Sequence, residues 1–199
     1  RVYIIEENQP NAFATGRSPN HAVVAVTDSI MQTLNREELE AVLAHELSHV
    51  KNRDILTMTV ASFVAMIASM IMNNFLFASI FSNREQGGAW IIAGIVAAVV
   101  WVIATLLMMA LSRYREFAAD RGSAYITNNP DSLISALQKI SGRMDRLPPE
   151  AKVAAEGANA FYIIPALSGK TLAGLFSTHP ALEKRIENLE KVRAEIRGY

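Results

Sequence analysis

Two histidines and a glutamate lie close together in the first quarter of the chain, where His45, Glu46 and His49 form the pattern H-E-x-x-H. Residues four apart project from one face of an α-helix, so a helix here would present both imidazoles to one metal ion, as a tetrahedral zinc site requires. Glu46 would lie close enough to take a proton from a water at the metal without binding the ion, which is the position of a general base. The spacing therefore predicts a site that activates water for hydrolysis.

The residues around the motif favour the helix that this chemistry needs. Asn35 followed by Glu38 is typical of a capping box at a helix N-terminus. Apolar residues then recur at helical spacing, at Leu39, Val42, Leu43, Leu47 and Val50. A chance match is the alternative to a metal site, but composition alone gives this pattern in well under about one chain in a hundred.

A third protein ligand is expected, because a catalytic zinc site usually holds three side chains and leaves a fourth position open for water. The best candidate is Glu116. Glu116 and Asp120 are four residues apart and would share one face of a helix. Asp120 would then accept a hydrogen bond from a ligand histidine and orient it. Clusters of arginine, glutamate and aspartate are more often solvated helix faces, so from the residues alone both interpretations stay open.

The composition indicates that part of the chain is buried in an apolar environment other than its own protein core. Of the 199 residues 51% are hydrophobic, and the mean hydropathy is +0.18, which is high for a soluble domain. No charged residue occurs at 55–83 or at 86–112, and each run exceeds the about 20 residues that cross a bilayer as a helix. We predict a transmembrane helical hairpin in a lipid bilayer. Buried helices of a soluble core are the alternative, but a chain this short has too little other material to cover them.

Charge and cysteine content narrow the kinds of site. The formal net charge is zero, so no basic field predicts binding to nucleic acid. Because the chain has no cysteine, disulfides and thiolate ligands are excluded, and nitrogen and oxygen must hold the metal. We infer one zinc ion per chain, although such ligands also accept other divalent ions.

The expected fold class is mainly α with a small β element, an α+β fold. Residues 2–5 and 21–27 predict strands. We expect a single domain over 1–199, in which 1–54 hold the strands and the motif helix, 55–112 form the inserted hairpin, and 113–199 hold the third-ligand helix and C-terminal helices. Because the chain begins with Arg1 and not Met, we also expect an N-terminally truncated or processed chain.

Four motifs in the right order, with two hydrophobic segments between the histidine pair and the glutamate, resemble the HtpX family of membrane zinc metalloproteases over nearly all of the chain. The motifs are His45 to His49, Glu116 to Asp120, Asn11 to Gly16 and Ser177 to Pro180. The resemblance implies an integral-membrane endopeptidase with Glu116 as third zinc ligand. It also implies peptide or membrane-protein substrates that are misfolded or damaged, and hence a role in protein quality control under stress.

The resemblance implies roles for residues that the sequence alone would pass over. In the family a histidine placed like His179, with an arginine six residues on like Arg185, faces the developing oxyanion over the zinc. Both could converge as donors, one at a helix N-terminus and one within its first two turns. A helix-entry histidine and a solvated arginine are the plainer alternative. The resemblance also favours Asn11, Ala12 and Phe13 as an edge that holds an extended peptide by main-chain hydrogen bonds, rather than as support for the helix.

The order of the segments predicts the topology. His45 and His49 precede the first apolar run and Glu116 follows the second, so the chain must return to the side it left if all three bind one ion. Basic residues flank the hairpin on that side, whereas its turn holds Arg84 alone. By the positive-inside rule the active site of this multi-pass protein faces the cytoplasm, at the plasma (inner) membrane.

Two other functions stay open. A CAAX prenyl-protein protease is similar only around the motifs and has many more hydrophobic segments. A non-enzymatic membrane scaffold with a structural metal would need a fourth protein ligand that closes the site.

Overall fold

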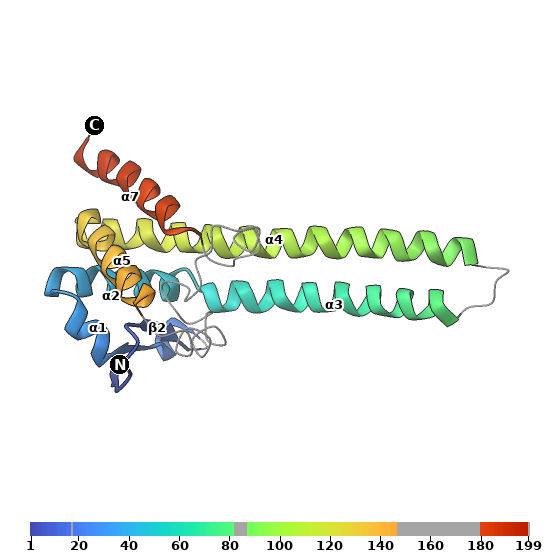
Figure 1. Cartoon of the computed structure of the whole chain (residues 1–199), viewed down its shortest axis with the longest axis horizontal. Coiled ribbons are helices and arrows are strands. Elements are labelled where there is room, and N and C mark those ends of the chain that lie inside the picture. The colour runs from blue at the N-terminus through green and yellow to red at the C-terminus, as the bar shows by residue number, and fades with distance from the viewer. Residues whose placement is uncertain (17, 82–86, 147–179, 199) are drawn as a thin grey trace. The chain divides into compact units, whose positions relative to one another are not determined.

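The computed structural model describes residues 1–16, 18–81, 87–146 and 180–198, which are mostly helical with one small sheet, as predicted (Figure 1). The elements in chain order are β1 (Val2–Ile5), β2 (Ala12–Thr15), the short 3-10 helix η1 (Pro19–His21), β3 (Val23–Thr27), α1 (Asp28–Thr33), α2 (Arg36–Lys51), α3 (Asp54–Phe81), α4 (Gly87–Thr127), α5 (Pro130–Asp145) and α7 (Leu182–Arg197).

The chain divides into two compact units. One unit comprises Arg1–Ile55 and Arg113–Tyr199, and the other comprises Leu56–Ser112. The first unit contains the sheet, α2, the last turns of α4 and every described residue of the predicted site. The second unit contains most of α3 and the first part of α4.

The sheet has the order β1-β3-β2, with β1 parallel and β2 antiparallel to β3. The backbone N–H of Thr27 donates to the carbonyl of Asn11, so these two residues face each other as a hydrogen-bonded pair of the antiparallel ladder. Because hydrogen-bonded pairs alternate along such a ladder, Asn11 and Phe13 turn their main-chain groups toward β3. Ala12 and Ala14 turn theirs to the opposite side of this edge strand, where Ala12 is only 1% exposed and the Ala14 N–H donates to Glu46.

The helix that carries H-E-x-x-H begins with the predicted capping box. Asn35 Oδ1 accepts a hydrogen bond from the Glu38 N–H, and Glu38 Oε2 accepts one from the Asn35 N–H, both at 2.9 Å. Leu47 departs from the predicted apolar stripe, since it is 49% exposed. The buried face of that turn is instead occupied by His45, Glu46 and Ser48, so polar residues replace the apolar stripe where the site begins.

The core of the first unit lies among α1, α2, α5 and α7. Its members are buried apolar side chains at helical spacing, among them Ile30, Val42, Leu133, Leu137, Ile140, Leu189 and Val192. The buried apolar residues of α5 and α7 thus recur at helical spacing. The last helix, α7, begins at Leu182 with the extended Ala181 as its N-cap, so Pro180 precedes the helix.

In the second unit α3 and α4 are long and apolar enough to cross a membrane. The candidate spans are Asp54–Phe75 and Ile92–Thr127, of which the second continues past Ser112 into the first unit, and none of the most apolar part of the first is buried within protein. Apolar side chains exposed over such lengths belong in lipid. Asn73 and Asn74 do not end the first helix, because Asn74 Nδ2 donates to the Met70 carbonyl within α3 at 2.8 Å and the helix continues to Phe81.

Candidate metal centre

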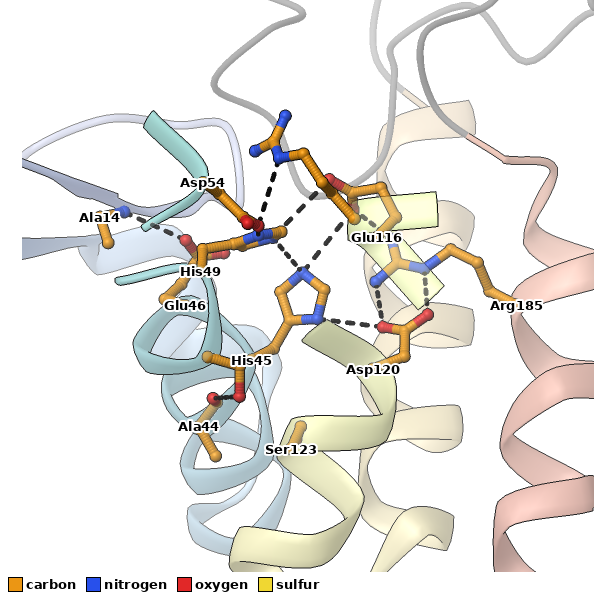
Figure 2. Close-up of polar contacts among 12 residues, drawn as sticks. Ala14, Ala44, His45, Glu46, His49, Asp54, Glu116, Asp120, Ser123 and Arg185 are labelled. Carbon is orange, nitrogen blue, oxygen red and sulfur yellow. Dashed lines mark hydrogen bonds and ion pairs between the residues drawn. The ribbon is translucent and has the colours of Figure 1, made fainter. Parts of the chain in front are cut away.

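His45 and His49 of α2 and Glu116 of α4 meet at one point in the first unit. One ligand atom from each lies within 4.8 Å of the other two. The two Nε2 atoms are 3.1 Å apart, and Glu116 oxygens lie 3.7 Å from His45 Nε2 and 3.6 Å from His49 Nε2. Figure 2 shows the three side chains pointing toward one another.

These distances fit a divalent metal ion. Ligands about 2.0–2.1 Å from a tetrahedral zinc are separated from one another by about 3.3 Å, which lies within the observed 3.1–3.7 Å. The donor set is two imidazole nitrogens and one carboxylate, which suits a catalytic zinc site with an open position. His45 is fully buried, Glu116 is 5% exposed and the His49 side chain is 15% exposed, so the set is only partly accessible to bulk water.

Close packing between α2 and α4 brings Glu116 to the histidines. Gly122 of α4 lies against Ser48 of α2, where an added Cβ would be only 2.8 Å from the Ser48 Cβ and would collide with its Oγ. One residue on, Ser123 Oγ donates to the Ala41 carbonyl at 2.6 Å. Because position 122 carries only a hydrogen, α4 can approach α2 closely enough for Glu116 to lie beside His45 and His49.

Asp120 and Arg185 form a buried pair beside His45. His45 Nδ1 lies 3.0 Å from Asp120 Oδ1, and Arg185 donates to the same carboxylate from Nε at 2.9 Å and from Nη2 at 2.6 Å. Arg185 Nη1 is 3.7 Å from Glu116 Oε2. Burial alone would lower the pKa of Arg185, but Asp120, Glu116 and Glu46 hold the pKa above its usual value, so the guanidinium stays charged. His179, the other residue expected above the metal, lies outside the described residues.

Glu46 is 7% exposed and its Oε2 accepts a hydrogen bond from the Ala14 N–H at 3.0 Å. Ala14 belongs to β2, so the open edge of the sheet reaches the residue expected to act as a base (Figure 2). Burial raises the pKa of Glu46 and neighbouring Glu116 adds to the rise, while His45 and His49 oppose it. A raised pKa makes a carboxylate a better proton acceptor near neutral pH.

Sequence reasoning missed two residues that complete the surroundings of His49. His49 Nδ1 lies 2.6 Å from Asp54 Oδ2, and the same oxygen lies 3.3 Å from Arg115 Nε. Five residues separate His49 from Asp54, a spacing that does not share a face of one helix. The polar run from Lys51 to Asp54, directly after the motif helix, was the available signal that the helix ends there.

Comparison with known proteins identifies the family. Residues 1–193 match the model described as peptidase family M48. The chain belongs to peptidase family M48. It is 55% identical over 198 residues to protease HtpX homolog 2 of Methanosarcina acetivorans and 50% identical over 200 residues to protease HtpX homolog of Moorella thermoacetica. Both alignments cover 98% of this chain and 67% of the relative.

A solved structure has the same fold. Ste24p of S. mikatae aligns with a TM-score of 0.62 at 18% identity, over 95% of this chain and 44% of that one. At this identity the likeness concerns the fold alone. The predicted membership of the HtpX family is confirmed by the sequence relatives, and with it the enzyme class, a membrane metallopeptidase.

Proposed function

We propose that this chain is a zinc-dependent endopeptidase that hydrolyses peptide bonds of misfolded or damaged membrane proteins at the cytoplasmic face of the plasma (inner) membrane. The observation that carries the proposal is the cluster of His45, His49 and Glu116, with Glu46 buried beside it on the same helix as the histidines. Three ligands leave a fourth position for water, unlike a closed structural site. The family match favours a peptidase over a scaffold.

The chemistry divides between the ion and Glu46. When bound, zinc would polarise the scissile carbonyl and make water acidic enough to react near neutral pH. Glu46 takes a proton from the attacking water and later delivers it to the leaving amine. The Ala14 N–H holds Oε2 and so restrains the carboxylate in one orientation. Asp120 Oδ1 lies 3.0 Å from His45 Nδ1, close enough to favour the imidazole tautomer that would present Nε2 to the metal.

Arg185 and His179 serve as donors to the oxyanion that forms during attack. The support for Arg185 is its place next to the ligand set and its fixed charge, since two of its nitrogens are held by Asp120 and the third lies toward Glu116. A positive charge that is already oriented stabilises a developing negative charge without reorganisation. The role of His179 stays a prediction from the family resemblance.

The open edge of β2 selects extended substrates. Of the three residues predicted for this edge, Asn11 and Phe13 use their main-chain groups to pair with β3, and Ala12 is only 1% exposed, so a peptide would have to pair beside Ala14, whose N–H donates to Glu46. A peptide that adds a strand here is bound through its main chain and need not have one sequence. This binding mode suits substrates that are unfolded but have no recognition sequence in common.

The test is made on the full chain, purified in mild detergent, with two forms of one small membrane protein as substrates, one stable and one destabilised by a core substitution. We expect about one zinc per chain, cleavage of the destabilised form only, loss of cleavage with a chelator and recovery with zinc. Glu116→Ala should lose both zinc and cleavage. Cleavage that survives complete metal removal would overturn the proposal, and tightly held zinc without cleavage would favour the scaffold.

A further inference from the structure

Asp54 contacts His49, whereas Asp120 contacts the other candidate ligand histidine, His45. Its Oδ2 lies 2.6 Å from His49 Nδ1, at the ring nitrogen opposite the one that faces the metal ligands (Figure 2). Asp54 is 4% exposed, so its carboxylate has little access to solvent. A buried carboxylate at this distance from an imidazole determines which way the ring faces and which nitrogen carries the hydrogen.

We propose that Asp54 is the positioning residue for His49 and that Arg115 acts on the metal site through Asp54. The proposal rests on the metal site of the proposed function and extends it to two residues that touch no metal. Asp54 fixes the imidazole so that Nε2 points at the ion. Arg115, whose Nε lies 3.3 Å from the same carboxylate oxygen, balances its charge and attracts it electrostatically.

The backbone before Asp54 supports this role. On an unbroken helix a residue five positions on lies about 140° around the axis, so Asp54 could not reach His49. The chain instead ends α2 at Lys51, places Arg53 in the left-handed region at φ 56°, and starts α3 at Asp54. A non-glycine residue in this region is uncommon and costs energy, and such strain persists where the surrounding structure requires it. The strained turn is what carries the Asp54 carboxylate back to His49.

Arg115 completes an arrangement that the two ligand histidines share. His45 contacts Asp120, which is paired with Arg185 of α7, and His49 contacts Asp54, which lies 3.3 Å from Arg115 Nε of α4. Each imidazole thus has a buried carboxylate with an arginine beside it: Arg185 donates two hydrogen bonds to Asp120, and Arg115 forms an ion pair with Asp54. Arg115 directly precedes Glu116, so one turn of α4 supplies the third ligand and also steadies the second.

The competing role for Asp54 is local, because an acidic residue in the first turn also stabilises a helix N-terminus. Asp54→Ser separates the two roles, since serine is well tolerated at helix starts but cannot replace the carboxylate on His49. We measure zinc affinity by chelator competition and the visible absorption spectrum of the cobalt(II) form, which reports ligand geometry. We expect Asp54→Ser and Asp54→Ala to weaken zinc binding by about 10–100-fold and to alter the cobalt spectrum.

Asp54→Asn should have a smaller effect, because the amide carbonyl can still accept from Nδ1. If Asp54→Ser keeps both the zinc affinity and the cobalt spectrum of the parent, Asp54 only starts the helix and the proposal is overturned. A parent chain that binds no zinc would instead overturn the metal site itself, and this proposal with it.

A double-mutant cycle tests the part of Arg115. We expect Arg115→Met to weaken zinc binding by about fivefold or more in the parent and to have no further effect in the Asp54→Ser background. Arg121→Met is the matched control, because Arg121 lies on the same helix and forms an exposed ion pair with Glu195. Its zinc affinity should equal that of the parent. If Arg115→Met has the same effect in both backgrounds, Arg115 does not act through Asp54.

Discussion

Gly122 packs against Ser48 so closely that no room is left between them for a methyl group. We predict that Gly122→Ala pushes α4 away from α2 and so moves Glu116 from the histidines. Zinc affinity should fall at least about tenfold, and the free energy of unfolding should fall by about 1–3 kcal/mol, as for overpacked cores. Zinc titration and thermal unfolding in detergent measure the two effects.

Two variants control for the effect of alanine itself. No described residue lies within 4 Å of a Cβ added to Gly142 of α5, so Gly142→Ala should leave zinc affinity unchanged and stabilise the helix slightly. Combining Gly122→Ala with Ser48→Gly removes the side chain in the way and should restore most of the zinc affinity. If the double variant binds zinc no better than Gly122→Ala, separation of the helices is not the cause.

Glu46→Gln should keep the metal and abolish peptide hydrolysis. The amide preserves the size of the side chain but cannot take the proton of the attacking water. We expect zinc content equal to the parent and kcat lowered by at least about a hundredfold. Glu40→Gln, an exposed carboxylate on the same helix, should retain full activity. Near-parental turnover of Glu46→Gln would exclude Glu46 as the general base.

Glu38 predicts how stability depends on pH. It accepts from Ser135 Oγ at 2.6 Å and from Lys139 Nζ at 2.8 Å, and it closes the capping box with Asn35. Burial raises the pKa of Glu38, but these hydrogen bonds outweigh burial and lower it below the usual 4.5. The folded state therefore binds the proton more weakly than the unfolded state. The stability that Glu38 contributes is complete above pH 4.5 and is lost as pH falls through the folded pKa.

Glu38→Gln should consequently lower stability at pH 7 by about 1–3 kcal/mol and flatten the decline between pH 5 and pH 3. Thermal unfolding across this range is the measurement. Glu37→Gln, an exposed neighbour on the same turn, should follow the parent curve. An unchanged slope in Glu38→Gln would show that other carboxylates cause the decline.

Elements with local causes could be predicted from the sequence. The capping box at Asn35 and the spacing of His45 and His49 each depend on residues within about one turn of one another. The candidate transmembrane helices were predicted from the length and composition of the uncharged runs, which can also be read directly from the sequence.

Contacts between distant segments could not be predicted in the same way. Ala14 reaches Glu46 across 32 residues, and Arg185 reaches Asp120 across 65. Neither pair has a repeating pattern, because tertiary packing alone decides which helix faces and strand edges meet. Asp54 was missed for a different reason: it is near His49 in sequence, but only the left-handed turn at Arg53 brings it back to the imidazole.

The predicted topology places the turn of the hairpin and the C-terminal helix α7 on opposite sides of the membrane, which labelling can test. The chain has no cysteine, so Gln86→Cys and Lys191→Cys each introduce a single labelling site. With a membrane-impermeant maleimide, position 86 should react in sealed cells and position 191 only after the cells are opened. The reverse pattern would place the active site outside the cytoplasm.

Variants of Arg185 and Asp120 distinguish a role of Arg185 in catalysis from a role in assembling the metal site. Its hydrogen bonds with Asp120 imply that Arg185→Ala could act in two ways, by removing a donor to the oxyanion or by releasing Asp120 and hence His45. Our proposal predicts the first: zinc content and KM stay near parental values while kcat falls by about a hundredfold or more, as on loss of an oxyanion-hole donor. Asp120→Asn is the matched variant, because it weakens the link to His45 while keeping the guanidinium. It should lower zinc affinity by about 10–100-fold, which Arg185→Ala should not do. If Arg185→Ala also loses zinc to that extent, the arginine holds the site together through Asp120 and is no oxyanion donor.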